Sequence, residues 1–133
     1  MPSPCFRSNG AAHMPDKFGL QEAAKRGVNL GKVGQRIVLE NEHVRIWEIN
    51  LDPGETIDFH IHYHPYVVIS LGGGENEIET IFGDRIKTVE ELGSTVFINE
   101  MRAVHRLTNR AKVPYLSRLI ELKHVRWTTE VKS

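Results

Sequence analysis

Short apolar runs separated by turn residues follow one another from residue 35 to the end of the chain. They are rich in Val, Ile, Leu, Tyr and Phe, which favour β-strands, and Gly, Asp, Asn or Pro stand between them. No helical pattern of ordinary length interrupts the series, so we predict an all-β fold of about eight short antiparallel strands, a sandwich or a barrel. The runs span residues 36–40, 43–51, 57–62, 66–71, 76–82, 85–89, 95–98, 104–108 and 115–122.

One hairpin can be placed from the sequence alone. The segment IFGDRI is predicted to turn through Gly83 and Asp84 between two strands. In the strand before the turn, Ile78, Thr80 and Phe82 share one face, and glutamates lie on the other. This alternation predicts a sheet with one buried face and one face in water.

The first part of the chain has a different pattern of residues, with three prolines and only one helical candidate before residue 35. That candidate is the segment 16–27, for which Gly27 is a suitable C-terminal stop. We therefore predict an N-terminal arm, residues 1–34, that carries a short helix, followed by a β-domain, residues 35–133.

Composition narrows the partners of the protein. Its 133 residues carry 17 basic and 17 acidic side chains, so no net charge attracts nucleic acid or an anionic membrane. The apolar runs are too short to cross a bilayer. Cys5 is the only cysteine, which excludes an internal disulfide, and the N-terminus lacks the pattern of a signal peptide. We expect a cytoplasmic protein that binds neither nucleic acid nor membrane.

Three histidines occupy alternate positions, His60, His62 and His64, shortly after the turn at 52–54. Residues two apart in a strand point the same way and lie about 7 Å apart, so two imidazoles can lean onto one metal ion. His60 and His62 are the natural pair. His64 lies about 13 Å from His60 along a straight strand and joins them only if the chain bends near Pro65.

A mononuclear site needs a third ligand from elsewhere, and His105 lies in another short β run. The alternative is that these histidines line the wet face of a sheet and bind nothing. A His-x-His pair after a Pro-Gly turn, with a distant histidine in an all-β domain, favours the metal site over that alternative.

A stretch of 56 residues that begins at Gly54 resembles the two sequence motifs of the cupin superfamily. The first family motif is Gly, five residues, His-x-His, three or four residues, Glu, six residues, Gly. Here Gly54 is followed by ETIDF and then by His60 and His62. Tyr66, or Val67 in the other permitted register, stands at the position of the Glu, and Gly73 closes the motif.

The second family motif is Gly, five residues, Pro-x-Gly, two residues, His, three residues, Asn. Here Gly93 is followed by STVFI, and Asn99 and Met101 stand where the family has Pro and Gly. His105 comes one position later than in the motif, and Asn109 follows it after three residues. Both motifs occur in order, and the resemblance implies a cupin-type jelly-roll β-barrel.

The resemblance also implies that His60, His62 and His105 are metal ligands. The metal-binding Glu of the family is missing, because Tyr66 stands in its place. Either the site holds no metal, or it is a histidine-only site in which His64 could take the vacant position. A phenol with a pKa near 10 is a poor ligand for most divalent ions, so we expect Tyr66 to hydrogen-bond to a ligand or substrate instead.

A histidine-only site has a predictable charge. Three neutral imidazoles leave a divalent ion its full charge, so the site should favour a bidentate anionic guest such as an enolate or a carboxylate. We expect Zn, Fe, Ni or Mn as the ion. Asp58 shares strand parity with the histidine pair and could accept an imidazole N–H. Arg102 could meet the carboxylate of a guest, and Asn109 and Tyr66 complete the candidates for the surrounding pocket.

Three functions are compatible with these residues. The first is a small metalloenzyme, a dioxygenase, lyase or isomerase, that acts on a small organic acid or diketone. The second is a non-catalytic sensor that binds metal or a small molecule, and the third is a metal-free isomerase whose histidines act as acid and base. We rank the enzyme first because the sequence shows no DNA-binding or signalling domain. A homodimer is expected, because cupins of this size commonly pair and the arm has too little apolar content to fold alone.

Overall fold

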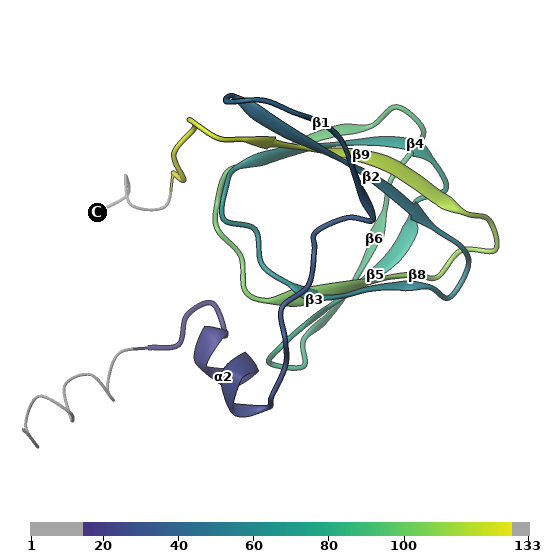
Figure 1. Ribbon diagram of the computed structural model, residues 1–133. Helices are drawn as coiled ribbons and strands as arrows, with labels where there is room; N and C mark the ends of the chain where they lie inside the picture. The colour runs from purple at the N-terminus through teal and green to yellow at the C-terminus, as the bar shows by residue number, and fades with distance from the viewer. Residues whose placement is uncertain (1–14, 129–133) are drawn as a thin grey trace, which may run out of the picture.

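The computed structural model describes residues 15–128. In that range nine strands form two antiparallel sheets, which face each other in Figure 1. One sheet has the order β1-β2-β9-β4-β7, and the other has the order β3-β8-β5-β6. The predicted all-β jelly-roll fold is confirmed. The strands are β1 (Arg36–Glu40), β2 (Val44–Leu51), β3 (Thr56–His60), β4 (Tyr66–Gly72), β5 (Glu75–Thr80), β6 (Arg85–Val89), β7 (Thr95–Ile98), β8 (His105–Asn109) and β9 (Tyr115–Leu122).

Alternate residues of the five-stranded sheet fill the interior of the barrel. On β9 the buried residues are Tyr115, Ser117, Leu119 and Glu121, and the residues between them are less buried. Trp47 of β2 lies opposite Leu119 and is also buried. Burial of one face of each strand removes its apolar side chains from water, which is the main stabilisation of such a barrel. This core comprises Val33, Trp47, Ile49, Leu51, Ile57, Tyr66, Tyr115 and Leu119.

The short helix of the predicted arm, α2 (Leu20–Lys25), lies outside the barrel below β3 in Figure 1. Ala23 is its buried residue and packs in a second apolar cluster with Phe59. The helix starts at Leu20 because Gly19 before it has φ of 77°, outside the helical range. The carboxylate of Asp16 accepts the N–H groups of the first turn of the helix, at 3.0 and 2.8 Å. Gly27, with φ of 69°, ends it as predicted.

The rest of the described arm follows the barrel wall. The N–H of Gly31 donates to the carbonyl of Phe59 at 2.9 Å, and the side chain of Val33 belongs to the barrel core. The described part of the arm is thus packed on the barrel. Residues 1–14 of the predicted arm lie outside the described residues. None of the helices in residues 15–128 is long and apolar enough to cross a membrane.

The predicted hairpin between β5 and β6 is confirmed, with Gly83 in the turn at φ of 94°. Phe82 was predicted to share the inward face of β5, and this prediction is wrong. The strand ends at Thr80, so Phe82 lies in the turn and is 50 % exposed. Sequence alternation predicts a face only as far as the strand itself continues.

Gly74, between β4 and β5, is expected to tolerate no side chain. Its φ is 134°, and a Cβ there would collide with the main-chain oxygen of Glu90. We expect Gly74→Ala to lower the free energy of unfolding by about 2 kcal/mol or more, through backbone strain and this collision together. Gly83→Ala is the matched control, because φ is also positive there but nothing lies within 4 Å of the added Cβ. If urea unfolding shows the same loss of unfolding free energy in both variants, the result would contradict the role of the collision.

Candidate metal centre

His60 and His105 are direct partners across β3 and β8. The pairing passes from Ile57 opposite Leu107 to His60 opposite His105, so three steps on β3 match two on β8, which is a β-bulge. The extra residue changes which side chains face inward, so that Ile57 and His60 both line the barrel cavity. The bulge therefore aims His60 at the barrel interior.

The bulge also overturns one prediction. Asp58 was expected to share the face of His60, but Asp58 is exposed and its carboxylate accepts the N–H of Phe59 at 2.8 Å. It is the main-chain carbonyl of Asp58 that contacts the histidine, at 2.7 Å from the Nδ1 of His60. The predicted hydrogen-bond partner is thus present in the backbone and not in the side chain.

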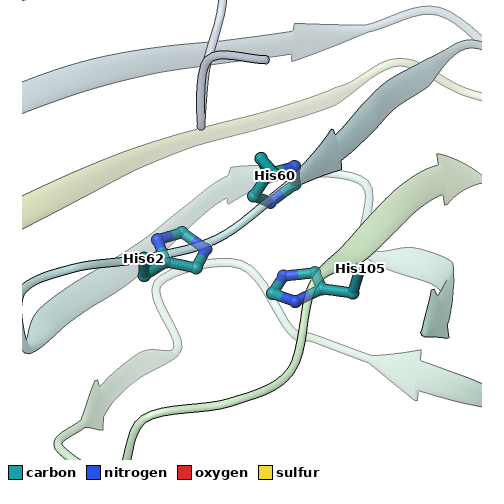
Figure 2. A group of neighbouring side chains, drawn as sticks. All are labelled: His60, His62 and His105. Carbon is teal, nitrogen blue, oxygen red and sulfur yellow. The ribbon is translucent and has the colours of Figure 1, made fainter. Parts of the chain in front are cut away.

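Figure 2 shows His60, His62 and His105 gathered around one space, the first two from the end of β3 and the segment after it. All three are buried, and their candidate ligand atoms lie within 4.8 Å of one another. The ring centroid of His60 lies 5.1 Å from that of His62 and 4.5 Å from that of His105. The structure therefore brings together three of the four histidines that the sequence singled out.

Hydrogen bonds leave nitrogens of these rings available to a ligand. The Nδ1 of His105 lies 2.8 Å from the carbonyl of Ala103, and that of His60 has the corresponding contact described above. Because a carbonyl only accepts, Nδ1 carries the proton in each ring and the lone pair is on Nε2. The Nδ1 of His62 is buried and has no hydrogen-bond partner in the described residues. A donor set of this kind fits a metal ion, which accepts lone pairs from neutral imidazoles.

Burial keeps the three rings neutral. Burial, together with the neighbouring His105, lowers the pKa of His60 to about 4, against the opposing effect of its hydrogen bond to the Asp58 carbonyl. Burial also lowers the pKa of His62, with contributions from the other two rings and from Arg102. The pKa of His105 is lowered by burial as well, against the opposing effect of its hydrogen bond. Neutral imidazoles are the form that binds metal, so proton competition is weak at neutral pH.

Tyr66, which replaces the Glu of the family motif, stacks on His62 with a centroid distance of 4.0 Å and an interplanar angle of 21°. Burial raises its pKa to about 12, so the phenol stays protonated at neutral pH. Its hydroxyl is then a neutral hydrogen-bonding group beside the histidines, as expected for a residue that contacts a guest.

The histidines line a cavity of about 330 Å³, a size suited to a small organic molecule. Arg102 is exposed and also lines this cavity. Its guanidinium brings a positive charge close to the histidine group, as the lowered pKa of His62 and His105 reflects. The other lining residues are Val33, Ile49, Ile57, Tyr66, Val68, Ile78, Thr88, Val89, Glu90, Val96, Ile98, Leu107, Tyr115 and Leu119.

Two predicted site residues lie elsewhere. His64 is half-buried and outside the group whose ligand atoms converge. Asn109 is fully buried, but its amide N–H groups donate to the carbonyls of Leu51 and Val113, both at 2.9 Å. Its side-chain oxygen accepts the N–H of Ala111 at 2.8 Å. Asn109 therefore joins backbone segments and does not line the cavity.

Sequence reasoning missed a second polar pair in the cavity. The hydroxyl of Tyr115 donates to both carboxylate oxygens of Glu90, each at 3.0 Å. Both residues line the same cavity as the histidines, and Thr88 lies beside them on β6. The alternation along RIKTVE, which puts Thr88 and Glu90 on one side of the strand, was a signal that could have identified them.

Cupin proteins are among the solved structures that are similar to this chain. A cupin domain from Bordetella pertussis Tohama I is 23% identical, with a TM-score of 0.61, and the match covers 71% of this chain and 99% of that domain. A conserved protein with a double-stranded beta-helix domain from Klebsiella pneumoniae matches at 20% identity over 75% of this chain and 87% of its own, with a TM-score of 0.51. A cupin superfamily protein from Desulfitobacterium hafniense DCB-2 matches at 16% identity over 82% and 94%, with a TM-score of 0.50.

The match in three dimensions goes beyond what sequence comparison detects. No protein-family model matches the chain, and no curated protein matches it. At these identities the likeness shows the fold: two antiparallel sheets arranged as in cupin proteins. The prediction made from the two motifs is confirmed at this level.

Proposed function

We propose that this cupin-type protein holds a divalent transition-metal ion, Zn, Fe, Ni or Mn, on His60, His62 and His105. The observation that carries the proposal is the group of three buried imidazoles whose candidate ligand atoms lie within 4.8 Å of one another. The unpartnered Nδ1 of His62 supports it, because a buried polar atom without a partner is costly and a ligand would remove that cost.

We further propose that the protein is a small metalloenzyme, a dioxygenase, lyase or isomerase, acting on an organic acid or a diketone. No carboxylate joins the three histidines in the described part of the chain, so nothing there reduces the charge of a bound ion. Arg102 at the cavity can hold the carboxylate or enolate oxygen of a guest, and Tyr66 presents its hydroxyl beside His62. A bound ion would supply Lewis-acid activation of the oxygen that it binds.

A non-catalytic sensor with the same metal and ligand is the second candidate, because a binding pocket for an anionic molecule serves either role. A metal-free isomerase fits the geometry less well. Burial lowers the pKa of His60 to about 4, which makes its imidazole a weak base at neutral pH. A cytoplasmic location belongs to the same proposal and rests on the composition of the sequence.

Thermal unfolding with and without metal tests this function. Small carboxylates and β-diketones should raise the melting temperature of metal-loaded protein and leave that of metal-free protein unchanged, because the ion is their main anchor. An equal rise in both samples would favour the metal-free isomerase. No rise with any compound in either sample would contradict an organic acid or diketone as the guest.

The outer face of the five-stranded sheet supports the proposed homodimer. One residue from each strand forms an apolar stripe across the whole sheet, and each is the register partner of the next. Leu39 and Phe97 at its two ends are 47 % and 52 % exposed. In a dimer with a two-fold axis, the apolar stripe of the second copy would pack against this stripe and cover it. The stripe consists of Leu39, Ile46, Ile120, Val67 and Phe97.

Phe97→Glu is expected to convert the dimer to a monomer, because it would bury a charge against the apolar stripe of the second copy. Light scattering after size exclusion at micromolar protein measures the change. Leu92→Glu is the control, since Leu92 is 76 % exposed in the turn after β6 and lies off the stripe. A wild-type monomer, or a dimer that survives Phe97→Glu, would contradict this interface.

A further inference from the structure

We propose that Glu90 and Tyr115 form a second binding point of the same cavity and select an elongated organic acid whose far end donates a hydrogen bond. That far end is a hydroxyl or an ammonium group, and the carboxylate end lies at the histidines. The inference rests on the proposed function for its first binding point. It adds the chemical class of the ligand and the residues that bind the end of the ligand far from the histidines.

The two binding points lie at opposite ends of the cavity. Tyr66, beside the histidines, is the register partner of Glu121 on β9. Tyr115 is six residues earlier on the same strand, which corresponds to about 20 Å along the strand before the side chains extend into the cavity. One cavity is nevertheless lined by both His62 and Glu90. A guest that contacts both ends must therefore be longer than a simple small acid.

Glu90 has the chemistry of an acceptor for such a guest. Its side chain is half-buried and accepts the hydroxyl of Tyr115 at both oxygens, at 3.0 Å each. No Lys, Arg or His forms an ion pair with Glu90 within residues 15–128. Burial raises the pKa of Glu90, so its charge is poorly compensated by the protein. A donor group on the guest would compensate it.

Further unpartnered polar atoms surround this end of the barrel. The hydroxyl of Thr88, in the cavity wall, is buried and has no hydrogen-bond partner in the described residues. The same is true of both polar atoms of the Asn76 side chain, which is fully buried and is the register partner of Thr88 on β5. Buried polar groups of this kind are normally satisfied, so their presence here indicates a polar partner supplied by a guest or by water.

The walls between the two ends are apolar. Val68 and Leu119 are register partners on neighbouring strands, and both line the cavity with Val96 and Leu107. These side chains offer no hydrogen bond, so the middle of the guest should be a hydrocarbon chain or ring. The cavity therefore fits a molecule with an anionic end, an apolar body and a hydrogen-bond-donating end.

Isothermal titration calorimetry of metal-loaded protein with straight-chain carboxylic acids of matched length tests the inference. The acids end in methyl, hydroxyl or ammonium, and the bound metal is measured in the same samples. The acids with a hydroxyl or ammonium end should bind about tenfold more tightly than the methyl acid, the usual effect of one added hydrogen bond to a charged group.

Glu90→Leu should remove this preference for both donor ends, and Glu90→Gln should remove it for ammonium more than for hydroxyl, because an amide oxygen still accepts. Glu91→Leu is the control, since Glu91 is the exposed neighbour of Glu90. Retained metal in each variant shows that the barrel and the histidine site are intact.

Equal binding of the three acids by wild-type protein, or a preference that survives Glu90→Leu, would overturn the inference and leave the proposed function in place. Failure of every acid to bind protein that does hold metal would overturn both the inference and the organic acid as the guest. A preference for ammonium alone, lost in Glu90→Gln, would identify the far end as cationic.

Discussion

Replacing His60 and His62 together by alanine is expected to abolish metal binding and to leave the barrel folded. Wild-type protein should hold about one divalent transition-metal ion per chain, and one remaining imidazole cannot retain it. The fold should survive because the apolar core around Trp47 and Leu119 is separate from the ion, unlike the core of a zinc finger. Elemental analysis of the purified protein and circular dichroism measure the two effects.

The control for this variant is the double replacement of His43 and His124 by alanine. These exposed histidines lie 5.5 Å apart between ring centroids and outside the candidate site, so their loss should leave the metal content unchanged. Tyr66→Phe should also retain the metal, because a protonated phenol is not expected to be a ligand. Equal metal contents in wild type and in the variant that lacks His60 and His62 would contradict the proposal that these histidines bind the metal.

Metal-free protein is expected to lose stability as the pH falls from about 6.5 to about 4. The pKa of His60 is lowered from 6.5 to about 4 in the folded protein, mainly by burial. Between these values the unfolded chain binds a proton at this position and the folded chain does not, so protonation favours unfolding. The loss reaches up to about 3 kcal/mol for His60 alone, because each pKa unit corresponds to about 1.4 kcal/mol. His62 and His105 shift in the same direction and add to it.

Urea unfolding of metal-free protein across this pH range measures the effect. His60→Gln is the comparison, because glutamine cannot take up the proton and the variant should lose less stability on acidification. The difference between the two proteins isolates His60 from the carboxylates, which also titrate as the pH falls. Identical pH profiles for wild type and His60→Gln would show that His60 is not held neutral by burial.

The fold and the core of the candidate site were within reach of the sequence because both depend on short-range patterns. Period-two alternation marks the strands, and the Gly and Pro residues mark the turns. His60 and His62 are separated by only one residue, so their convergence needs little of the tertiary structure. His105 could be offered as a third ligand from its short β run, and the family resemblance supported it. Its convergence with His60 joins strands that lie far apart in the sequence.

The failures have physical reasons as well. A β-bulge in β3 turned Asp58 away from the histidines, and no residue type in that segment predicts a bulge. Asn109 matches the family motif, but its amide is used by three backbone hydrogen bonds. Glu90 was overlooked because its importance depends on Tyr115, which reaches it from another strand. Contacts between distant strands follow from topology, which local patterns do not contain.

Anomalous X-ray diffraction from a crystal of metal-loaded protein, recorded at the absorption edge of the ion, tests the central claim most directly. We predict one anomalous peak at the centre of the group formed by His60, His62 and His105, about 2.1 Å from one nitrogen of each ring. A single site of this kind would establish the histidine-only metal centre. A peak elsewhere on the protein, or no peak at these three histidines in protein soaked with Zn, Fe, Ni and Mn in turn, would contradict it.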